Sequence, residues 1–499
     1  MQIYNPYLPE GEYIPDGEPH VFGDRLYIFG SHDCANGEKF CINDYVGWSA
    51  PLCDLSDWRY DGVIYQAKQD PHSRNGKLQL WAPDVVKGND GRYYLYYCCS
   101  FSNFVSVAVC NTPTGKYEYL GDVHYEDGTC VGHRAEEGGV FDPAVLNDNG
   151  RFWLYSGFSP NFKGAAQYIA KDEGKNIVII AAEDIQKAKN NFSSDDSMVY
   201  VSDGGYVYEL LPDMLTVRDG NLSVPGVNNS FGTGFEGHEF YEASSIRKIN
   251  EKYYFVYSSV LSHELCYAVS DRPNGGFKYG GTIISNADIG YDGRRQDEGV
   301  CYFGNNHGGL VELNGEWYIF WHKHTNSTCY SRQGCADKVH IEKDGRIKQV
   351  KITSCGLNGK PLKGEGNYPA YIACILYGKE GVCDNNVASH PKFAQYGADG
   401  ANIAYQYIEN LRDESVFGFR YFDLKNEKRL TVTTRGDNGQ LHIYNGINEK
   451  TIGKITVTKG KDWHCSDSVN ITADACTELV FCYKGNGKLD VKSICFDNL

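Results

Sequence analysis

Residues 81–96, WAPDVVKGNDGRYYLY, contain the unit that decides the fold: an acidic residue, a turn rich in Gly, Asn and Asp, and an aromatic run. This unit occurs five times in the first two thirds of the chain, and in the fifth copy a histidine takes the place of the acidic residue. The aromatic runs are Leu26-Tyr27-Ile28-Phe29, Tyr93-Tyr94-Leu95-Tyr96, Phe152-Trp153-Leu154-Tyr155, Tyr253-Tyr254-Phe255-Val256 and Trp317-Tyr318-Ile319-Phe320. Because a regular repeat is typical of radial or stacked folds, the sequence predicts such an architecture.

Additional strand signals follow some of the aromatic runs. Residues 107–109, Val-Ala-Val, lead into the turn Thr112-Pro113-Thr114-Gly115. Each repeat therefore supplies about four strands, and four-stranded sheets around an axis form a β-propeller. The sequence predicts five blades over residues 1–355. A longer third interval indicates an insertion at 160–235, expected as loops or an extra hairpin, with a short helix candidate at 183–189.

The pattern changes at the end of the repeats. Residues 356–366 are rich in Gly, Pro and Lys and are predicted to be a linker. Residues 367–499 carry alternating strand patterns separated by turns, for example at 429–433 and 454–457. We therefore expect an all-β protein, with a five-bladed β-propeller followed by a jelly-roll-like β-sandwich.

Charge and hydropathy restrict the partners. The chain of 499 residues has a formal net charge of −16, which argues against nucleic acid and anionic membranes, since both attract basic patches. No apolar stretch approaches the length of a membrane-spanning helix. An acidic surface suits a soluble protein with a neutral ligand. The oligomeric state stays open.

The cysteines and the N-terminus bear on the compartment. The 18 Cys residues include no CxxC pair, and many lie inside predicted strands, where Cys behaves as a small buried apolar residue. The first residues lack the basic and apolar regions of a signal peptide. We expect free thiols in the cytoplasm. Secretion after removal of a native signal peptide is the alternative.

One polar residue stands about ten positions before each aromatic run. These residues are Asp16, Asp84, Asp142, Glu242 and His307. In a propeller this offset places each residue near the start of an innermost strand, so the five side chains are expected to converge on the axis. Asp before Pro or Gly is also ordinary turn chemistry. Five such residues in register favour a shared site.

Carboxyl groups gathered in this way suit glycoside hydrolysis. One protonated carboxyl donates a proton to the leaving oxygen, and an ionised carboxylate activates water or attacks the anomeric carbon. A third carboxylate nearby raises the pKa of the acid by charge repulsion. A metal site is the rival use, although acids with a single His are a weak transition-metal set. His322 and His324 share one face of a predicted strand, where packing is the favoured interpretation.

Several segments resemble glycoside hydrolase family 43. They are Asn5–Pro9, Ile14–Pro19, Trp81–Asp84, Phe141–Pro143, Phe240–Ser245 and His307–Glu312. The resemblance extends from residue 1 to about residue 355 and implies a five-bladed propeller that inverts the anomeric centre. It implies that Asp16 is the general base and Glu242 the general acid, while Asp142 tunes the pKa of the acid. Glu239 is a rival for the acid but lacks the Glu-Ala-Ser context.

The resemblance also implies residues that contact the substrate. Trp81 and Phe141 would form walls of the sugar pocket, and Arg295 or its neighbour Arg294 would contact the sugar or a carboxylate. His307 matches a central His that takes part in a calcium or water site in some members. No cofactor is expected to be required, and a structural calcium ion is left open.

The C-terminal part resembles, more weakly, a family 6 carbohydrate-binding module. The resemblance lies in residues 417–422 and 431–437. Such modules bind sugar through exposed aromatic residues, and this domain has one Trp, Trp463. Sugar binding and structural support of the propeller are both open for this domain.

Together these features predict an inverting exo-glycosidase that releases a terminal pentose from plant hemicellulose-derived oligosaccharides. The expected pentose is α-L-arabinofuranose, β-D-xylose or both. The alternatives are an endo-arabinanase or galactan-directed enzyme of the same fold, and a carbohydrate-binding propeller without turnover. WD-repeat and kelch signatures are missing from the sequence.

Overall fold

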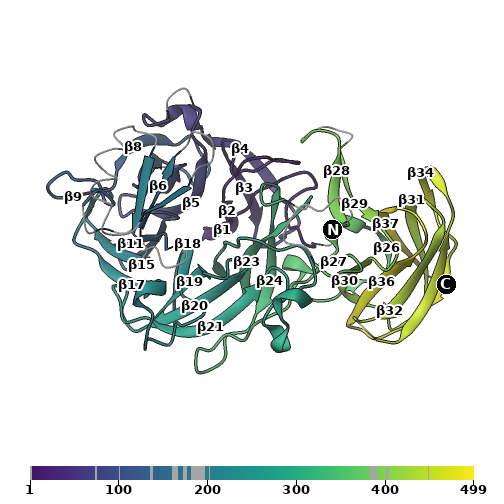
Figure 1. The fold of residues 1–499 in the computed structure, drawn as a ribbon. Helices are drawn as coiled ribbons and strands as arrows, with labels where there is room; N and C mark the ends of the chain where they lie inside the picture. The colour runs from purple at the N-terminus through teal and green to yellow at the C-terminus, as the bar shows by residue number, and fades with distance from the viewer. Residues whose placement is uncertain are drawn as a thin grey trace.

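The computed structural model describes most of the chain as two β-domains that lie side by side, with the N-terminus between them (Figure 1). It describes residues 3–73, 76–100, 102–134, 137, 139–159, 167–171, 177–180, 197–201, 203–326, 328–382, 390–399, 404–447 and 449–498. The N-terminal domain is a propeller and the C-terminal domain a β-sandwich. The predicted all-β fold class is confirmed.

Three of the blades are antiparallel sheets of four strands each. Blade 1 consists of β1 (Glu18–Phe22), β2 (Arg25–Phe29), β3 (Tyr45–Pro51) and β4 (Arg59–Tyr65). Blade 2 consists of β5 (Leu80–Lys87), β6 (Tyr93–Cys99), β7 (Ser106–Cys110) and β8 (Glu118–Asp122). Blade 4 consists of β18 (Phe240–Ile249), β19 (Lys252–Ser259), β20 (Glu264–Ser270) and β21 (Lys278–Ser285).

Blades 3 and 5 depart from this plan. Blade 3 is built from β10 (Ala144–Asp148), β11 (Arg151–Gly157), β15 (Gly204–Leu210), β16 (Thr216–Val217) and β17 (Asn221–Pro225), with β9 (His124–Tyr125) pairing to β16. Its insertion carries a separate small sheet of β12 (Gln167–Lys171), β13 (Ile177–Ile180) and β14 (Ser197–Val201). The helix candidate at 183–189 lies outside the described residues. Blade 5 has β22 (Leu310–Leu313), β23 (Glu316–His324) and β24 (Arg332–Val339).

The aromatic runs form the second strand of each blade. These strands are buried along nearly their whole length, as in β6, where every residue is buried. Among the described residues, five clusters of buried side chains each join two neighbouring blades, for example Phe29 of blade 1 and Leu95 of blade 2. A blade has a neighbour on both faces, so its central strands need apolar residues on both sides, which explains the continuous aromatic runs.

The ring of blades closes through the innermost strands. β1, β5, β10, β18 and β22 contact one another in this cyclic order. The N-terminal segment adds to the closure, because the N–H of Tyr7 donates to the carbonyl of Gly334 (3.2 Å) and the Asn5 side chain bonds to Ala336. The starts of the innermost strands consequently meet at one end of the axis.

The C-terminal domain packs two sheets around one buried cluster. One sheet holds β25 (Leu362–Lys363), β27 (Ile375–Tyr377), β30 (Val416–Asp423), β32 (Gly439–Asn445), β33 (Thr451–Val457) and β36 (Thr477–Lys484). The other holds β26 (Gly366–Pro369), β28 (Lys392–Tyr396), β29 (Tyr405–Leu411), β31 (Lys428–Gly436), β34 (Gly460–Cys465), β35 (Val469–Ile471) and β37 (Leu489–Asn498). Since β25 pairs with β30, the segment 356–366 already contains a strand of the sandwich.

Two further expectations concern thiols and membranes. Buried cysteines in the strands, such as Cys98 and Cys266, are free thiols. None of the helices among the described residues has the length and apolar character needed to cross a membrane.

Candidate active site

Four polar side chains meet at the end of the propeller axis where the innermost strands begin. Asp16 precedes β1, Asp142 precedes β10, Glu242 lies near the start of β18, and His307 precedes β22. The Nδ1 atom of His307 lies 3.6 Å from a carboxylate oxygen of Asp142. Asp16, Asp142 and His307 are buried, whereas Glu242 keeps part of its side chain accessible.

The backbone at this end of the axis is strained at three positions. Asp16, Asp142 and Ala243 adopt left-handed φ values of 55°, 45° and 67°, which residues other than glycine rarely adopt. Such conformations cost of order 1–3 kcal/mol each and are concentrated at functional sites. At Ala243 the left-handed turn directs the backbone N–H to Asp142, with 3.0 Å between N and Oδ2. Asp142 is thus hydrogen-bonded to the backbone of Ala243, the residue after Glu242, and both bonded residues have left-handed backbone conformations.

Two glycines let the segment that carries Asp16 approach its neighbours. A Cβ atom at Gly30 would lie 2.4 Å from the Pro15 carbonyl oxygen, and one at Gly334 would lie 2.8 Å from the Ile14 carbonyl oxygen. Both distances are too short for any side chain. Glycine at these positions therefore allows Ile14 and Pro15, which lead to Asp16, to pack directly against the end of β2 and against β24.

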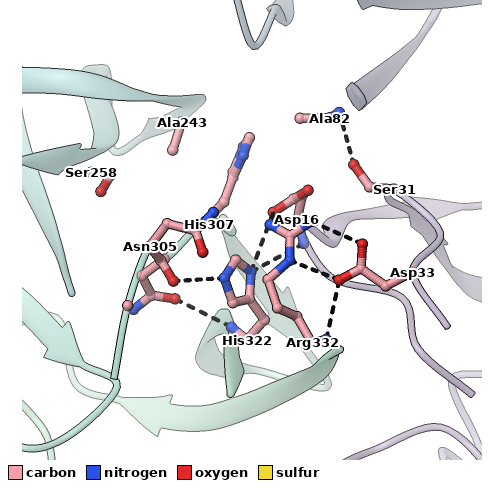
Figure 2. A network of polar contacts seen from close by, with 12 residues as sticks. Asp16, Ser31, Asp33, Ala82, Ala243, Ser258, Asn305, His307, His322 and Arg332 are labelled. Carbon is pink, nitrogen blue, oxygen red and sulfur yellow. Dashed lines mark hydrogen bonds and ion pairs between the residues drawn. The ribbon is translucent and has the colours of Figure 1, made fainter. Parts of the chain in front are cut away.

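Asp16 is held by a cation and an imidazole (Figure 2). Arg332 donates from Nη1 to Oδ1 of Asp16 (3.0 Å) and pairs with Asp33 through Nε (2.8 Å) and Nη2 (3.1 Å). His322 donates from Nε2 to the Asn305 carbonyl (2.7 Å), so its Nδ1 accepts the N–H of Asp16 (3.3 Å). Burial alone would raise the pKa of Asp16, but the positive charge of Arg332 holds it well below its usual range.

The other two carboxyl groups are shifted in the opposite direction. Burial raises the pKa of Glu242 to about 8, with a further contribution from the negative charge of Asp16. Burial also raises the pKa of Asp142 well above its usual range, and the charges of Glu242 and Asp16 add to this shift. Near pH 7 the cluster thus holds one ionised carboxylate and protonated carboxyl groups, the division of roles that acid–base catalysis needs.

His307 is a neutral imidazole within this cluster, because burial lowers its pKa to about 4. Calcium takes six to eight oxygen ligands. Within the part of the chain that the structure describes, metal-ligating side chains gather in threes at Glu18/His20/Asp84 and at His238/Glu264/Cys266, and neither group includes His307.

Asp84 does not join the other four polar residues. One of its carboxylate oxygens lies 2.6 Å from Nε2 of His20, and the other accepts the N–H of Val145 (2.6 Å). Nearby, Glu18 pairs with Arg247 at 2.6 Å. These contacts tie the innermost strands of different blades together, so the role of Asp84 is structural.

Aromatic side chains form a wall beside the cluster. Trp81 and Phe141 meet edge to face with ring centroids 5.2 Å apart, and Phe158 continues the row at 5.1 Å from Phe141. Tyr241, next to Glu242, lies 5.4 Å from Phe158. All four residues are partly exposed, and the Tyr45 hydroxyl donates to the Trp81 carbonyl in β5 (2.6 Å). Flat apolar faces beside carboxyl groups suit a sugar ring.

Comparison with known proteins agrees with this geometry. Residues 27–211 match the family described as Glycosyl hydrolases family 43. A xylosidase/arabinosidase of Thermoclostridium stercorarium is 47% identical over 508 residues, which cover 99% of each chain. This chain belongs to glycosyl hydrolases family 43. It is a glycoside hydrolase.

Two more distant proteins match about 70% of this chain. A xylosidase/arabinosidase of Bacteroides ovatus is 27% identical over 70% of this chain and 99% of its own length. The crystal structure of a GH43_1 enzyme from Xanthomonas citri complexed with xylose covers 70% of this chain and 92% of its own, with 21% identity and a TM-score of 0.50. That enzyme shares the fold of the N-terminal domain.

Two sequence candidates of this family 43 chain lie apart from the cluster. The side chain of Arg295 is 70% exposed and pairs with Asp297 (3.1 Å), so the structure does not bring it to the carboxyl groups. The family resemblance had suggested Arg295 or its neighbour Arg294 as a contact of the sugar or a carboxylate. Glu239 is buried and accepts a hydrogen bond from Ser230 (3.0 Å), separate from Asp16 and Asp142.

Two residues of the site were missed. Arg332 lies 316 positions from Asp16 and 299 from Asp33, and no local pattern marks it. His322 was interpreted as packing together with His324, and the two do share a face, since both donate to the Asn305 carbonyl. The available signal was the pair of polar residues inside a strand that is otherwise buried and aromatic.

Proposed function

We propose that this family 43 enzyme is an inverting exo-glycosidase that releases terminal α-L-arabinofuranose or β-D-xylose from hemicellulose-derived oligosaccharides. The observation that carries the proposal is the opposite shift of carboxyl pKa values in one cluster, downward for Asp16 and upward for Glu242. The names of the Thermoclostridium and Bacteroides relatives, both xylosidase/arabinosidase, support a pentose as the sugar released.

In the proposed reaction Asp16 is the general base and Glu242 the general acid. The Asp16 carboxylate takes a proton from a water molecule while the water oxygen bonds to the anomeric carbon. The bond from this carbon to the leaving oxygen breaks, and Glu242 gives that oxygen its proton. The sugar leaves with inverted configuration, and solvent exchange returns Glu242 to its acid form and Asp16 to its base form.

The neighbours of these groups keep each in its required state. Arg332 keeps Asp16 ionised and oriented through a charge-assisted hydrogen bond. Asp142, in contact with the backbone after Glu242, is proposed to orient the acid and to tune its pKa. Trp81 and Phe141 are proposed to pack against the sugar ring. No step requires a metal or another cofactor, and we propose a cytoplasmic setting, which the buried free thiols favour.

The variant Glu242→Gln tests the acid, with Glu239→Gln as the matched control. Loss of a general acid is expected to lower kcat on an aryl β-D-xyloside or aryl α-L-arabinofuranoside by about 10²–10⁴-fold while product binding is retained. The control is expected to keep the parent rate. Unchanged hydrolysis by Glu242→Gln contradicts the assignment. Equal losses in both variants point to misfolding, which circular dichroism would detect.

Two further measurements test the rest of the proposal. Proton NMR of the first-formed product shows whether the anomeric configuration is inverted, and a retained configuration excludes Asp16 as a base acting on water. A panel of aryl arabinofuranoside, xyloside and galactoside identifies the sugar. Preference for the galactoside, or release of internal oligosaccharides from arabinan, would replace the exo-pentosidase assignment.

A further inference from the structure

The hairpin β23–β24 presents different residues on its two faces. Lys323 is paired with Gln333, and its neighbour His324 is paired with Arg332. Directly opposed residues share a face of a sheet, and successive residues alternate between faces. His322, His324 and Arg332 therefore lie on the face that carries the partners of Asp16. Lys323 and Gln333 lie on the reverse face.

Lys323 is bound by the C-terminal sandwich. Its Nζ atom donates to the carbonyls of Tyr371 (2.7 Å) and Ala373 (3.2 Å), and lies 3.9 Å from the centre of the Phe393 ring. The residue is only 5% exposed. A buried ammonium is tolerated only where such partners replace water. The sandwich thus supplies the polar and aromatic partners of Lys323, the residue next to His322 in β23.

Gln333 is bound by the sandwich as well. Its side-chain amide and that of Gln406 bond reciprocally, with N···O distances of 3.1 and 2.9 Å, and both residues are 1% exposed. Gln406 also accepts the N–H of Gly11 (3.3 Å) and donates to the Tyr13 hydroxyl (3.3 Å). One glutamine of the sandwich consequently joins β24 to the segment that leads to Asp16.

The sandwich also reaches the loop that carries Asp33. Asp399 accepts the N–H of Ala35 (2.9 Å), and Gln395 accepts the Tyr13 hydroxyl (2.8 Å). The Tyr13 carbonyl in turn accepts the N–H of Asp33 (3.0 Å). The sandwich therefore contacts three chain segments of the propeller. They carry Asp16, Arg332 and Asp33.

We propose that the C-terminal sandwich positions the catalytic base, with Gln406 as the central positioning residue. The sandwich holds the reverse face of the hairpin whose front face presents His322 and Arg332 to Asp16. It also holds the segment that ends at Asp16. This inference rests on the proposed role of Asp16 as the base. It gives the second domain a part in catalysis whether or not that domain also binds sugar.

The test is the full-length variant Gln406→Met, which keeps most of the side-chain volume and removes its hydrogen bonds. We expect kcat on the preferred aryl glycoside to fall by about 10-fold, because small displacements of a catalytic group are costly, with KM within about twofold of the parent. The acid limb of the kcat/KM profile is expected to move to higher pH as the pair between Asp16 and Arg332 loosens.

Gln440→Met is the matched control, since Gln440 is exposed on β32 of the same domain. Its kcat and pH profile are expected to equal those of the parent. Gln395→Ala is a milder second variant, expected to shift kcat and the acid limb in the same direction. It keeps the test informative if Gln406→Met does not fold.

A folded Gln406→Met or Gln395→Ala enzyme with the parent's kcat and acid limb, even with a lower melting temperature, would overturn the proposal, because the sandwich would then only stabilise the propeller. Failure of the proposed function gives a different result. In that case the parent itself does not hydrolyse aryl pentosides, and the same variant-to-parent ratios are measured on the glycoside that the parent does accept.

Discussion

Removal of the Arg332 charge is expected to raise the lower pH limit of activity. Arg332 pairs with Asp16 and with Asp33, so its loss alone would leave two buried carboxylates without a cation, at a cost of about 3–5 kcal/mol. The double variant Arg332→Met/Asp33→Asn removes the second carboxylate too. Compared with Asp33→Asn alone, it isolates the contact between Arg332 and Asp16.

The size of the effect follows from the contact. An opposite charge within hydrogen-bonding distance lowers a carboxyl pKa by about 1–3 units, and each unit corresponds to about 1.4 kcal/mol. Without Arg332, the largest effect that opposes burial is lost, so the pKa of Asp16 rises. The base works only when ionised, so a raised pKa removes activity on the acid side. The acid limb of the double variant should lie about 1–3 pH units above that of Asp33→Asn.

The assay is kcat/KM on an aryl pentoside between about pH 3.5 and 9 at constant ionic strength, with circular dichroism at each pH to exclude unfolded enzyme. Arg151→Met, which removes the positive charge of an exposed Arg paired with Glu209, serves as a control for the loss of a charge at the surface. If the double variant and Asp33→Asn share the same acid limb while both remain folded, Arg332 does not set the ionisation of the base and the reasoning is refuted.

Three other outcomes are expected. Because the Glu242 acid has a pKa raised to about 8, the parent's kcat/KM should decline on the alkaline side near that pH, and a decline already complete by about pH 6 would contradict this role. Asp142→Ala removes the acceptor of the Ala243 N–H and should reduce kcat about tenfold, and unchanged kinetics would show that Asp142 does not orient the acid. Trp81→Ala should raise KM about tenfold with a smaller change in kcat, since it removes an aromatic wall, whereas an unchanged KM would place the sugar elsewhere.

The propeller could be predicted from sequence because its packing leaves a local trace. Each blade is covered on both faces, so its second strand is apolar and aromatic over its whole length, as in β6. The turn before that strand and the acid before the turn recur at the same spacing. The boundary of the sandwich was harder to place, since β25 is a two-residue strand without a pattern of its own.

Most of the residues of the site could also be predicted from their positions in the repeat. Asp16, Asp142 and His307 precede the innermost strands of their blades and Glu242 lies near the start of its own, so radial symmetry brings them together. Asp84 has a similar position in its repeat, yet its carboxylate is hydrogen-bonded to His20 and to the backbone N–H of Val145. Position in the repeat therefore predicted where a residue lies in its blade, but it did not predict which side chains or backbone groups that residue contacts.

The sequence by itself determined the repeat, hence the propeller, and the set of carboxyl groups at its axis, because these depend on short-range periodicity. Only the tertiary structure decided which carboxyl is ionised. The Arg332 that keeps Asp16 charged comes from a strand 316 positions away, and Glu242 is kept protonated mainly by burial. Desolvation and Coulomb interactions depend on distance in space, and a linear sequence does not contain those distances.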